Sequence, residues 1–224
     1  MKDEPLLIRA DGSPEIGTGH VMRCLALSQA WSENGGSVYF IGEITGGLAS
    51  RLRVEGITVR VLESTPGEKN DALETARKAQ AVGASWVVVD GYHFDGSYQR
   101  RLREEGVRVL LLDDYGHADR YEADLVLNQN IDTEAALYAD RSEETELLLG
   151  PRYALLRKEF WSWRESRRTP QRQASRVLVT LGGADPDNCT EMVTGALDRL
   201  NREDLRCTVV IGRSNPNESS IAAA

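Results

Sequence analysis

The sequence predicts an α/β protein built around a parallel sheet. Short runs rich in Val, Ile and Leu alternate with segments of helical periodicity, and the connections between them are short. Polar side chains follow most of these runs, which is typical of the edge where the strands of a parallel sheet end. The chain has 224 residues, enough for one large domain or for one domain and part of a second.

Residues 6–83 predict three strands and three helices. The first long helix places apolar residues at helical spacing and ends at a Gly-Gly pair. The last one has Pro66 near its start and Gly83 after its end, the usual positions for these residues. We expect strands over 6–10, 37–42 and 57–62, and helices over 19–36, 46–56 and 66–83.

Three further apolar runs predict buried strands over 85–92, 107–115 and 123–130. In an open parallel sheet the ligand crevice lies beyond the carboxyl ends of the strands. We therefore expect one crevice formed by the polar residues that follow the strands, namely Asp11, His20, Asp90, Tyr92, Asp113, Asp114, Asn128 and Asn130.

The composition changes near residue 164, where an arginine-rich stretch with few apolar residues indicates an exposed connection. A new strand, a glycine loop, a helix over 188–200 and a strand over 205–212 follow, and the chain stops within a further helix. Because a lone βαβ piece buries little surface, we expect a truncated second domain. The predicted organisation is a Rossmann-like catalytic domain over 1–163, a basic linker over 164–175 and a partial nucleotide-binding domain over 176–224.

The overall charge is −8 and the pI is about 5.1, which argues against a nucleic-acid surface. The three cysteines, Cys24, Cys189 and Cys207, show no CxxC spacing, so neither a zinc site nor a disulfide framework is expected. The amino terminus lacks an apolar core of signal-peptide length, and no apolar run reaches the length of a membrane span. These features predict a soluble cytoplasmic protein without a membrane partner.

The loop after the first strand reads EIGTGH and precedes a helix. Gly17, Thr18 and Gly19 leave backbone amides free to face a phosphate at the positive end of that helix. A dinucleotide fingerprint would need a third glycine where Met22 stands. Glu43, after the second strand, could act as the ribose-binding acid of that motif, but the incomplete glycine pattern makes this a weak indication. A plain tight turn stays open as the alternative.

His20 stands in the first turn of that helix. The positive helix end disfavours an imidazolium, so a neutral His20 suits a general base, and a histidine that merely caps the helix is the alternative. Asp90 is either a site residue or a cap of the following segment, and Tyr92 packs on a sugar or donates a hydrogen bond. We expect His93 to be a solvated loop residue.

A metal site is a further alternative at the tip of the fifth strand. Asp113, Asp114 and His117 supply oxygen and nitrogen ligands there, but their spacing matches no established ligand motif, so we expect no metal and no other cofactor. The second unit repeats the first loop, with Gly182 and Gly183 after a strand and Asp185 before a helix. Two α/β halves with glycine loops suit a nucleotide-linked ligand.

Five stretches in their order along the chain resemble the PseG family: RADGSPEIGTGHVMRCLALSQAW, VVVDGYHFD, LLLDDYGHADRYEADLVLNQN, LLGPRYALLRKEF and VLVTLGGADPDN. These proteins are UDP-2,4-diacetamido-2,4,6-trideoxy-β-L-altropyranose hydrolases of pseudaminic acid biosynthesis, with related spore-coat polysaccharide proteins. The resemblance implies a GT-B-like fold of two Rossmann-like domains. It also implies water attack at the anomeric carbon and loss of UDP. Because a nucleoside diphosphate leaves without protonation, a single base suffices and no metal is required. A UDP-linked diacetamido sugar is then the expected ligand.

The resemblance implies that His20 is the catalytic base and that Tyr92 belongs to the catalytic site. The family's remaining uridine and diphosphate positions lie in a later part of its second domain. A glycosyltransferase on the same scaffold and a non-catalytic nucleotide-sugar-binding protein stay open as alternatives. The substrate-binding residues that we predict are Arg9, Asp11, Gly17, Thr18, Gly19, Arg23, Asp90, Asp113, Asn130, Gly182, Gly183 and Asp185.

Overall fold

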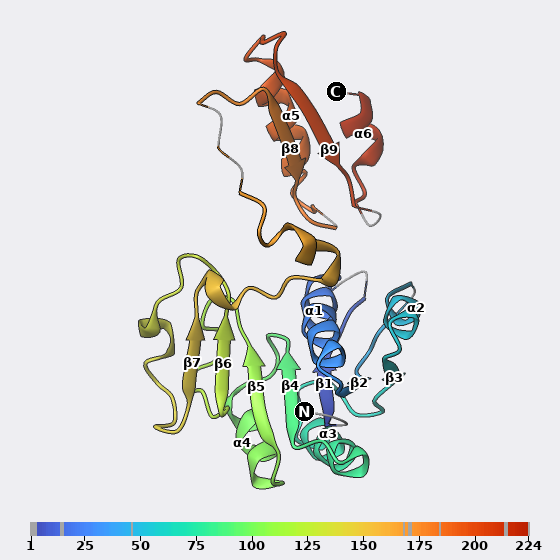
Figure 1. Ribbon diagram of the computed structural model, residues 1–224, viewed down its shortest axis with the longest axis vertical. Helices are drawn as coiled ribbons and strands as arrows, with labels where there is room; N and C mark the ends of the chain where they lie inside the picture. The colour runs from blue at the N-terminus through green and yellow to red at the C-terminus, as the bar shows by residue number, and fades with distance from the viewer. Residues whose placement is uncertain are drawn as a thin grey trace. The chain divides into compact units, whose positions relative to one another are not determined.

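The computed structural model describes residues 4–13, 16–45, 47–167, 169, 172–183, 185–212 and 215–223. The chain forms two compact units, Met1–Arg164 and Glu165–Ala224 (Figure 1). Residues 168, 170 and 171 of the predicted linker lie outside the described residues.

The first unit holds one sheet of seven strands in the order β3-β2-β1-β4-β5-β6-β7, and every pair is parallel. This confirms the predicted α/β fold with a parallel sheet. The chain moves outward in one direction from β1 and then in the other direction from β4, which makes the β1–β4 boundary the switch point of the sheet. The strands are β1 (Pro5–Ala10), β2 (Ser37–Ile41), β3 (Thr58–Arg60), β4 (Trp86–Asp90), β5 (Arg108–Leu112), β6 (Leu125–Asn128) and β7 (Glu146–Leu149).

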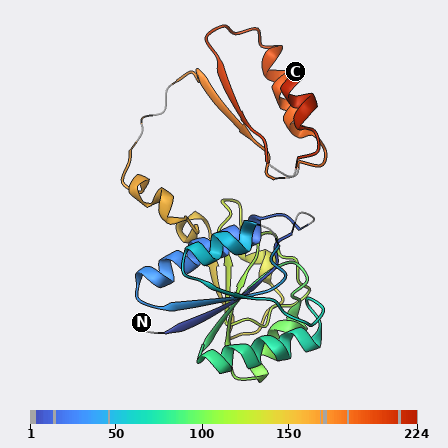
Figure 2. The same ribbon diagram turned by 90° about the vertical axis from the view of Figure 1, so that its right-hand side faces the viewer.

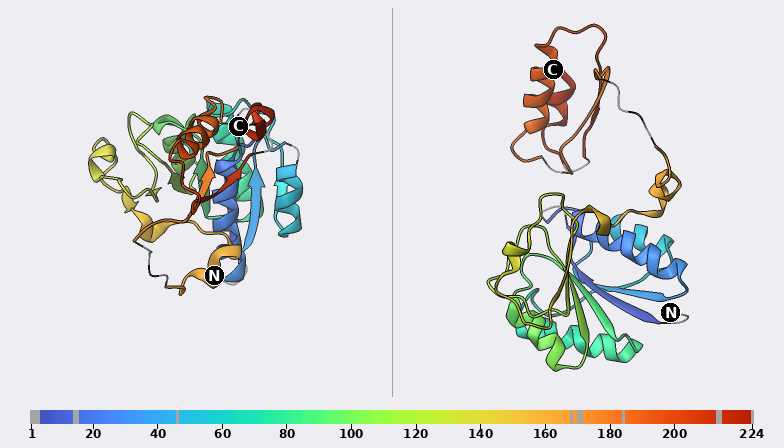
Figure 3. Two further views of the ribbon diagram at one scale, coloured as in Figure 1. Left: turned by 90° about the horizontal axis from the view of Figure 1, so that it is seen from above. Right: turned by 60° about the vertical axis from the view of Figure 1, so that its left-hand side comes forward.

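Four α-helices of the described chain cover the two faces of this sheet, as Figure 2 and the right-hand view of Figure 3 show. One face packs against α1 (Gly19–Glu33) and α2 (Gly47–Val54). The other face packs against α3 (Lys69–Val82) and α4 (Gly96–Glu104). Three short 3₁₀ helices also lie in this unit: η1 (Ala135–Tyr138), η2 (Pro151–Tyr153) and η3 (Lys158–Trp163).

The alternation of side chains along each strand explains the two apolar layers. Val87 and Val89 of β4 point into the layer beneath α3 and α4, whereas Val88 points into the layer beneath α1 and α2. Because both faces are covered, the central strands β1, β4 and β5 are apolar over most of their length, which is typical of parallel sheets. Their charged residues, Arg9, Asp90 and Arg108, stand at a strand end or next to one.

The helix boundaries differ from the predicted ones by a few residues. The first helix ends at Glu33, before the Gly-Gly pair. The helix expected from Pro66 begins at Lys69, and Gly83 closes it in the left-handed conformation at φ +74°, which a glycine adopts without steric cost. The sequence pattern missed α4 and the edge strand β7.

The second unit pairs two parallel strands, β8 (Arg176–Thr180) and β9 (Arg206–Val210). Its helices are α5 (Cys189–Asp198) and α6 (Glu218–Ala223). Apolar side chains of these strands, including Leu178 and Val210, are largely exposed within the described residues. The buried core of the protein thus lies mainly in the first unit.

Candidate functional site

A pocket of about 250 Å³ lies where β1 and β4 end, at the switch point of the sheet. Because the two strands are neighbours and Ala10 pairs with Asp90, the residues that follow them meet at one edge. The start of α1 adds His20 to the same pocket. The pocket is lined by Asp11, Ile16, His20, Asp90, Gly91, Tyr92 and His93.

The loop between β1 and α1 places His20 at this edge. Gly17 turns the chain in the left-handed conformation at φ +88°, and α1 begins two residues later. Val21, Cys24 and Leu25 are buried against the sheet and fix the rotation of α1 about its axis. Thr18 caps the helix without a side-chain hydrogen bond, and no acidic residue stands in the first turn.

His20 is paired with a buried carboxylate. Its Nδ1 lies 2.6 Å from Oδ1 of Asp90, which is fully buried at the end of β4. Arg23 Nη2 lies farther from Nδ1, at 3.3 Å, and a guanidinium can only donate. The shorter contact therefore decides the tautomer: Nδ1–H donates to Asp90, which leaves Nε2 as the acceptor. The His20 side chain is 12% exposed.

Arg23 holds Asp90 from the other side. Its Nε donates to Oδ2 and its Nη2 to Oδ1, both at 2.6 Å. Burial alone would raise the pKa of Asp90, but the hydrogen bonds from Arg23 and His20 lower it below its ordinary value. Asp90 is therefore ionised at neutral pH. The alternative that Asp90 caps the next helix is wrong, because Oδ1 of Asp95 accepts the hydrogen bond from the Tyr98 amide at 2.9 Å.

Tyr92 stands beside His20 at the mouth of the pocket. Its ring meets the imidazole edge-on, with 4.9 Å between ring centroids and an angle of 79°. Its hydroxyl donates to Oδ2 of Asp114 at 2.8 Å. Burial and this carboxylate raise the pKa of Tyr92 well above its ordinary value. Tyr92 therefore stays neutral and gives its proton to a hydrogen bond within the protein.

His93 forms a second histidine–carboxylate pair in the pocket. Its Nε2 lies 3.1 Å from Oδ2 of Asp11, and its ring packs on Phe94 at 4.0 Å between centroids. His93 is an exposed loop residue, as expected, and it also lies against the buried Asp11, a contact that the sequence did not reveal.

Arg9 does not reach the pocket. Its guanidinium is fully buried and donates to Asp11 at 2.6 Å and to Asp71 at 2.9 Å. The predicted direct contact between Arg9 and substrate therefore disagrees with its burial, and Arg9 instead fixes Asp11 from behind. Burial would raise the pKa of Asp11, but the nearby His93 imidazole and the hydrogen bond from Arg9 bring it to about 2.

Asp113 is also buried rather than turned toward the pocket, so the predicted substrate contact does not fit its position. It accepts hydrogen bonds from Tyr121 at 2.7 Å and from the amides that follow it, and His117 Nδ1 lies 3.2 Å away. Burial would raise the pKa of Asp113, but His117 and Tyr121 lower it. Among the described residues, no group of three or more His, Cys, Asp or Glu is arranged to hold a metal ion.

Asn130 braces the loop that carries Asp114. Its Nδ2 donates to the Asp114 carbonyl and its amide donates to Oδ1 of Asn128, both at 2.9 Å. Sequence reasoning placed Asp114 at the expected crevice and weighed it as a metal ligand, but did not assign it to the catalytic or substrate-binding residues. The signal was present in the adjacent aspartates at the end of β5, of which one turns inward and the other toward Arg23.

The glycine loop of the second unit lies in a separate compact part of the chain. Gly182 has φ +85°, and a Cβ on Gly212 would come within 2.3 Å of the Gly183 carbonyl oxygen, so the loop packs closely on the end of β9. Both carboxylate oxygens of Asp185 accept amides of the first turn of α5, from Cys189 and Thr190 at 2.9 Å. Asp185 thus caps a helix, and its role toward substrate stays a prediction.

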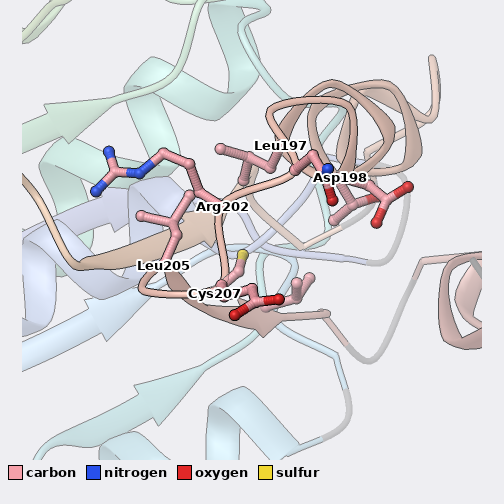
Figure 4. A pocket seen from close by; sticks show the side chains of 9 residues that line it. Leu197, Asp198, Arg202, Leu205 and Cys207 are labelled. Atoms are coloured by element: carbon pink, nitrogen blue, oxygen red, sulfur yellow. The ribbon is translucent and has the colours of Figure 1, made fainter.

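Figure 4 shows a larger cavity in the second unit, of about 390 Å³. Leu197 and Asp198 reach it from α5, and Leu205 and Cys207 reach it from the chain that enters and forms β9. Arg202 pairs there with Asp204, with Nε 3.0 Å from Oδ1. The cavity includes no residue of the glycine loop, so it is distinct from the predicted binding residues of this unit.

No protein-family model matches the chain. It is 26% identical over 212 residues to an uncharacterized protein of Methanocaldococcus jannaschii, covering 92% of this chain and 42% of that protein. It is 23% identical over 214 residues to the UDP-2,4-diacetamido-2,4,6-trideoxy-β-L-altropyranose hydrolase of Campylobacter jejuni, covering 95% of this chain and 71% of that enzyme. The chain thus spans less than half of the first relative and about seven tenths of the second.

A glycosyltransferase from Rickettsia africae has a similar structure. The TM-score is 0.60 at 14% sequence identity, over 98% of this chain and 64% of that one. This likeness confirms the predicted GT-B-like fold class of Rossmann-like units. In the part of the chain that the structure describes, no helix is both long and apolar enough to cross a membrane.

Proposed function

We propose that this protein is an enzyme that hydrolyses a UDP-linked diacetamido-trideoxyhexose, releasing UDP and the free sugar. The observation that carries the proposal is the His20–Asp90 pair, which leaves one imidazole nitrogen free in a pocket at the switch point of the sheet. The similarity to the Campylobacter hydrolase over 95% of the chain supports the same substrate class. In this proposal the protein acts in the cytoplasm, in the pathway to pseudaminic acid that the resemblance implies.

The reaction needs one base and one electrophilic carbon. A water molecule loses a proton to Nε2 of His20 as its oxygen attacks the anomeric carbon. The bond between that carbon and the phosphate oxygen breaks, and its electron pair leaves with UDP. Asp90 stabilises the imidazolium that forms, because its buried carboxylate accepts the Nδ1–H hydrogen bond at 2.6 Å. The imidazolium then returns its extra proton to solvent.

No general acid is required for the departing group. Glycosidases protonate the glycosidic oxygen so that a neutral alcohol leaves, whereas a nucleoside diphosphate departs as a stable anion. This agrees with Tyr92, whose hydroxyl proton is committed to Asp114 and whose pKa is raised. The amides of Thr18 and Gly19, at the positive end of α1, are the proposed donors to the phosphates from this unit, whereas the Gly17 amide already donates to the Ser13 carbonyl at 2.8 Å. Gly182 and Gly183 are proposed donors from the second unit.

A glycosyltransferase is the second candidate, and the structural likeness to the Rickettsia enzyme favours it. The same base would then deprotonate an acceptor hydroxyl instead of water. The residues around Nε2 of His20 do not distinguish hydrolysis from glycosyl transfer, because the base removes a proton from an O–H group in both reactions.

The deciding experiment incubates the protein with a panel of UDP-2,4-diacetamido-trideoxyhexoses in ¹⁸O-labelled water and no acceptor. We expect UDP release, with the label in the free sugar, because water attacks carbon. Label in UDP would show attack at phosphorus and would refute the mechanism. UDP release that appears only in a parallel incubation with an added acceptor sugar would establish the glycosyltransferase, and UDP binding without release in either incubation would establish a binding protein.

A further inference from the structure

Arg23 sits between two carboxylates that come from different strands. Nε and Nη2 are committed to Asp90, and Nη1 donates to Oδ1 of Asp114 at 2.6 Å. The Arg23 side chain is mostly buried, and the protein itself uses all three nitrogens. The geometry of Arg23 therefore depends on Asp114 as well as on Asp90, and its predicted role in binding substrate gives way to one inside the protein.

Asp114 has a second partner on its other oxygen. Oδ2 accepts the hydroxyl of Tyr92 at 2.8 Å. The Asp114 amide donates to Asp113 at 2.5 Å, and its carbonyl accepts from Asn130 at 2.9 Å, so the backbone of this residue is also held. One carboxylate thus connects the guanidinium that holds Asp90 with the ring that stands against His20.

These contacts close a ring of interactions. His20 bonds Asp90, Asp90 bonds Arg23, Arg23 bonds Asp114, Asp114 bonds Tyr92, and the Tyr92 ring returns to His20 at 4.9 Å. The ring joins the start of α1, the end of β4 and the loops after β4 and β5. Nε2 of His20 has no hydrogen-bond partner within the described residues, so the ring fixes the imidazole while its reactive nitrogen stays open.

We propose that Asp114 is a positioning residue for the base His20. It acts through Arg23 and Tyr92 and does not touch the reacting atoms. Without its charge, Nη1 of Arg23 loses its anionic partner and Tyr92 loses its strongest acceptor, so both neighbours of His20 gain rotational freedom. A base that is misplaced by about 1 Å lowers the rate about a hundredfold. Asp114 can therefore affect turnover although it contacts His20 only through Arg23 and Tyr92. This inference rests on the proposed hydrolysis.

The test substitutes Asp114→Asn in the full chain, because asparagine keeps the size and one acceptor but removes the charge. We expect kcat for UDP release to fall about 10- to 100-fold while KM changes less than about threefold. Asp119→Asn is the matched control: it changes an exposed aspartate in the same β5–β6 connection, and no described residue bonds it. We expect that control to keep the unsubstituted rate.

Two readouts separate positioning from loss of structure. The ring-carbon NMR signal of Tyr92, identified as the one that Tyr92→Phe removes, should shift in the Asp114→Asn protein at pH 7, because the Tyr92 hydroxyl loses its carboxylate acceptor. In a double-mutant cycle, Asp114→Asn should also slow a Tyr92→Phe protein by a smaller factor than it slows the unsubstituted one, because one of its two links is already gone.

An Asp114→Asn protein as fast as the unsubstituted enzyme would overturn the inference and leave the proposed function intact. Fully additive effects in the cycle, with an unmoved Tyr92 signal, would overturn it too. An unsubstituted protein that releases no UDP from any of the sugars would instead overturn the proposed function, and this inference with it. The failures of the two proposals are therefore distinguishable.

Discussion

The pocket holds two histidine–aspartate pairs that use the same residue types in different ways. His20 and Asp90 are 2.6 Å apart, and 12% of the histidine side chain is exposed. His93 and Asp11 are 3.1 Å apart, and 35% of that histidine is exposed. Each aspartate is also held by an arginine, Arg23 for Asp90 and Arg9 for Asp11. The pairs differ mainly in the second carboxylate that each arginine bonds.

Arg23 extends the first pair toward the pocket, since its third nitrogen reaches Asp114 and through it Tyr92. Arg9 extends the second pair into the core, where it bonds the buried Asp71, which also accepts the Tyr98 hydroxyl at 3.0 Å. A dyad of this kind is suited to catalysis when its supporting groups keep one imidazole nitrogen aimed at the ligand. We therefore expect the first pair to govern turnover and the second to govern stability.

The largest expected effect is that of His20→Gln. Removing the base should lower kcat for UDP release by about a thousandfold or more, the upper part of the range for general bases. The Kd for UDP, measured by calorimetry, should change less than about threefold, because the base contacts water rather than the nucleotide. A variant that keeps a tenth of the unsubstituted kcat would show that His20 is not the base.

Asp11→Asn should act mainly on stability. Its pKa of about 2 lies below the ordinary 3.8, so the ionised form stabilises the fold by about 2 kcal/mol. This contribution is full above about pH 4 and is lost as the pH falls toward 2. All four tryptophans lie in the first unit, so urea unfolding followed by tryptophan fluorescence reports on that unit alone. We expect the substituted protein to be less stable at pH 7 and the difference to shrink below pH 4.

A different result for Asp11→Asn would reverse the comparison. If kcat fell a thousandfold at an unchanged free energy of unfolding, the Asp11 pair would be the catalytic one. Asp119→Asn again serves as the control, because it removes an exposed charge that no described residue bonds. Its free energy of unfolding should stay within about 0.5 kcal/mol of the unsubstituted value.

Local patterns predicted the sheet and the position of His20, because alternating apolar runs and a glycine loop before a helix leave clear marks in a sequence. They missed β7, since a short apolar run such as that over 146–149 does not distinguish strand from helix. They also missed α4, whose nine residues are mostly polar and bury only a few side chains.

The supporting contacts of the site depend on pairings that no local pattern reveals. Arg9 meets Asp71 across 62 residues, and Arg23 meets Asp114 across 91. Each pairing follows from the order of strands in the sheet, which is settled only when the whole unit folds. For the same reason the sequence did not show that the exposed His93 lies beside Asp11, which follows a neighbouring strand.

The smallest expected effect is that of His93→Gln, the same substitution as in the first pair. Because the imidazole is partly exposed and its carboxylate keeps Arg9 and the Glu43 amide as partners, we expect kcat to fall less than about tenfold and the free energy of unfolding to fall by less than about 1 kcal/mol. Both quantities are to be measured beside His20→Gln. If the His93 variant lost as much activity as the His20 variant, the two pairs would act together on the substrate, and the exposure and length of a histidine–aspartate contact would be poor guides to which histidine is the base.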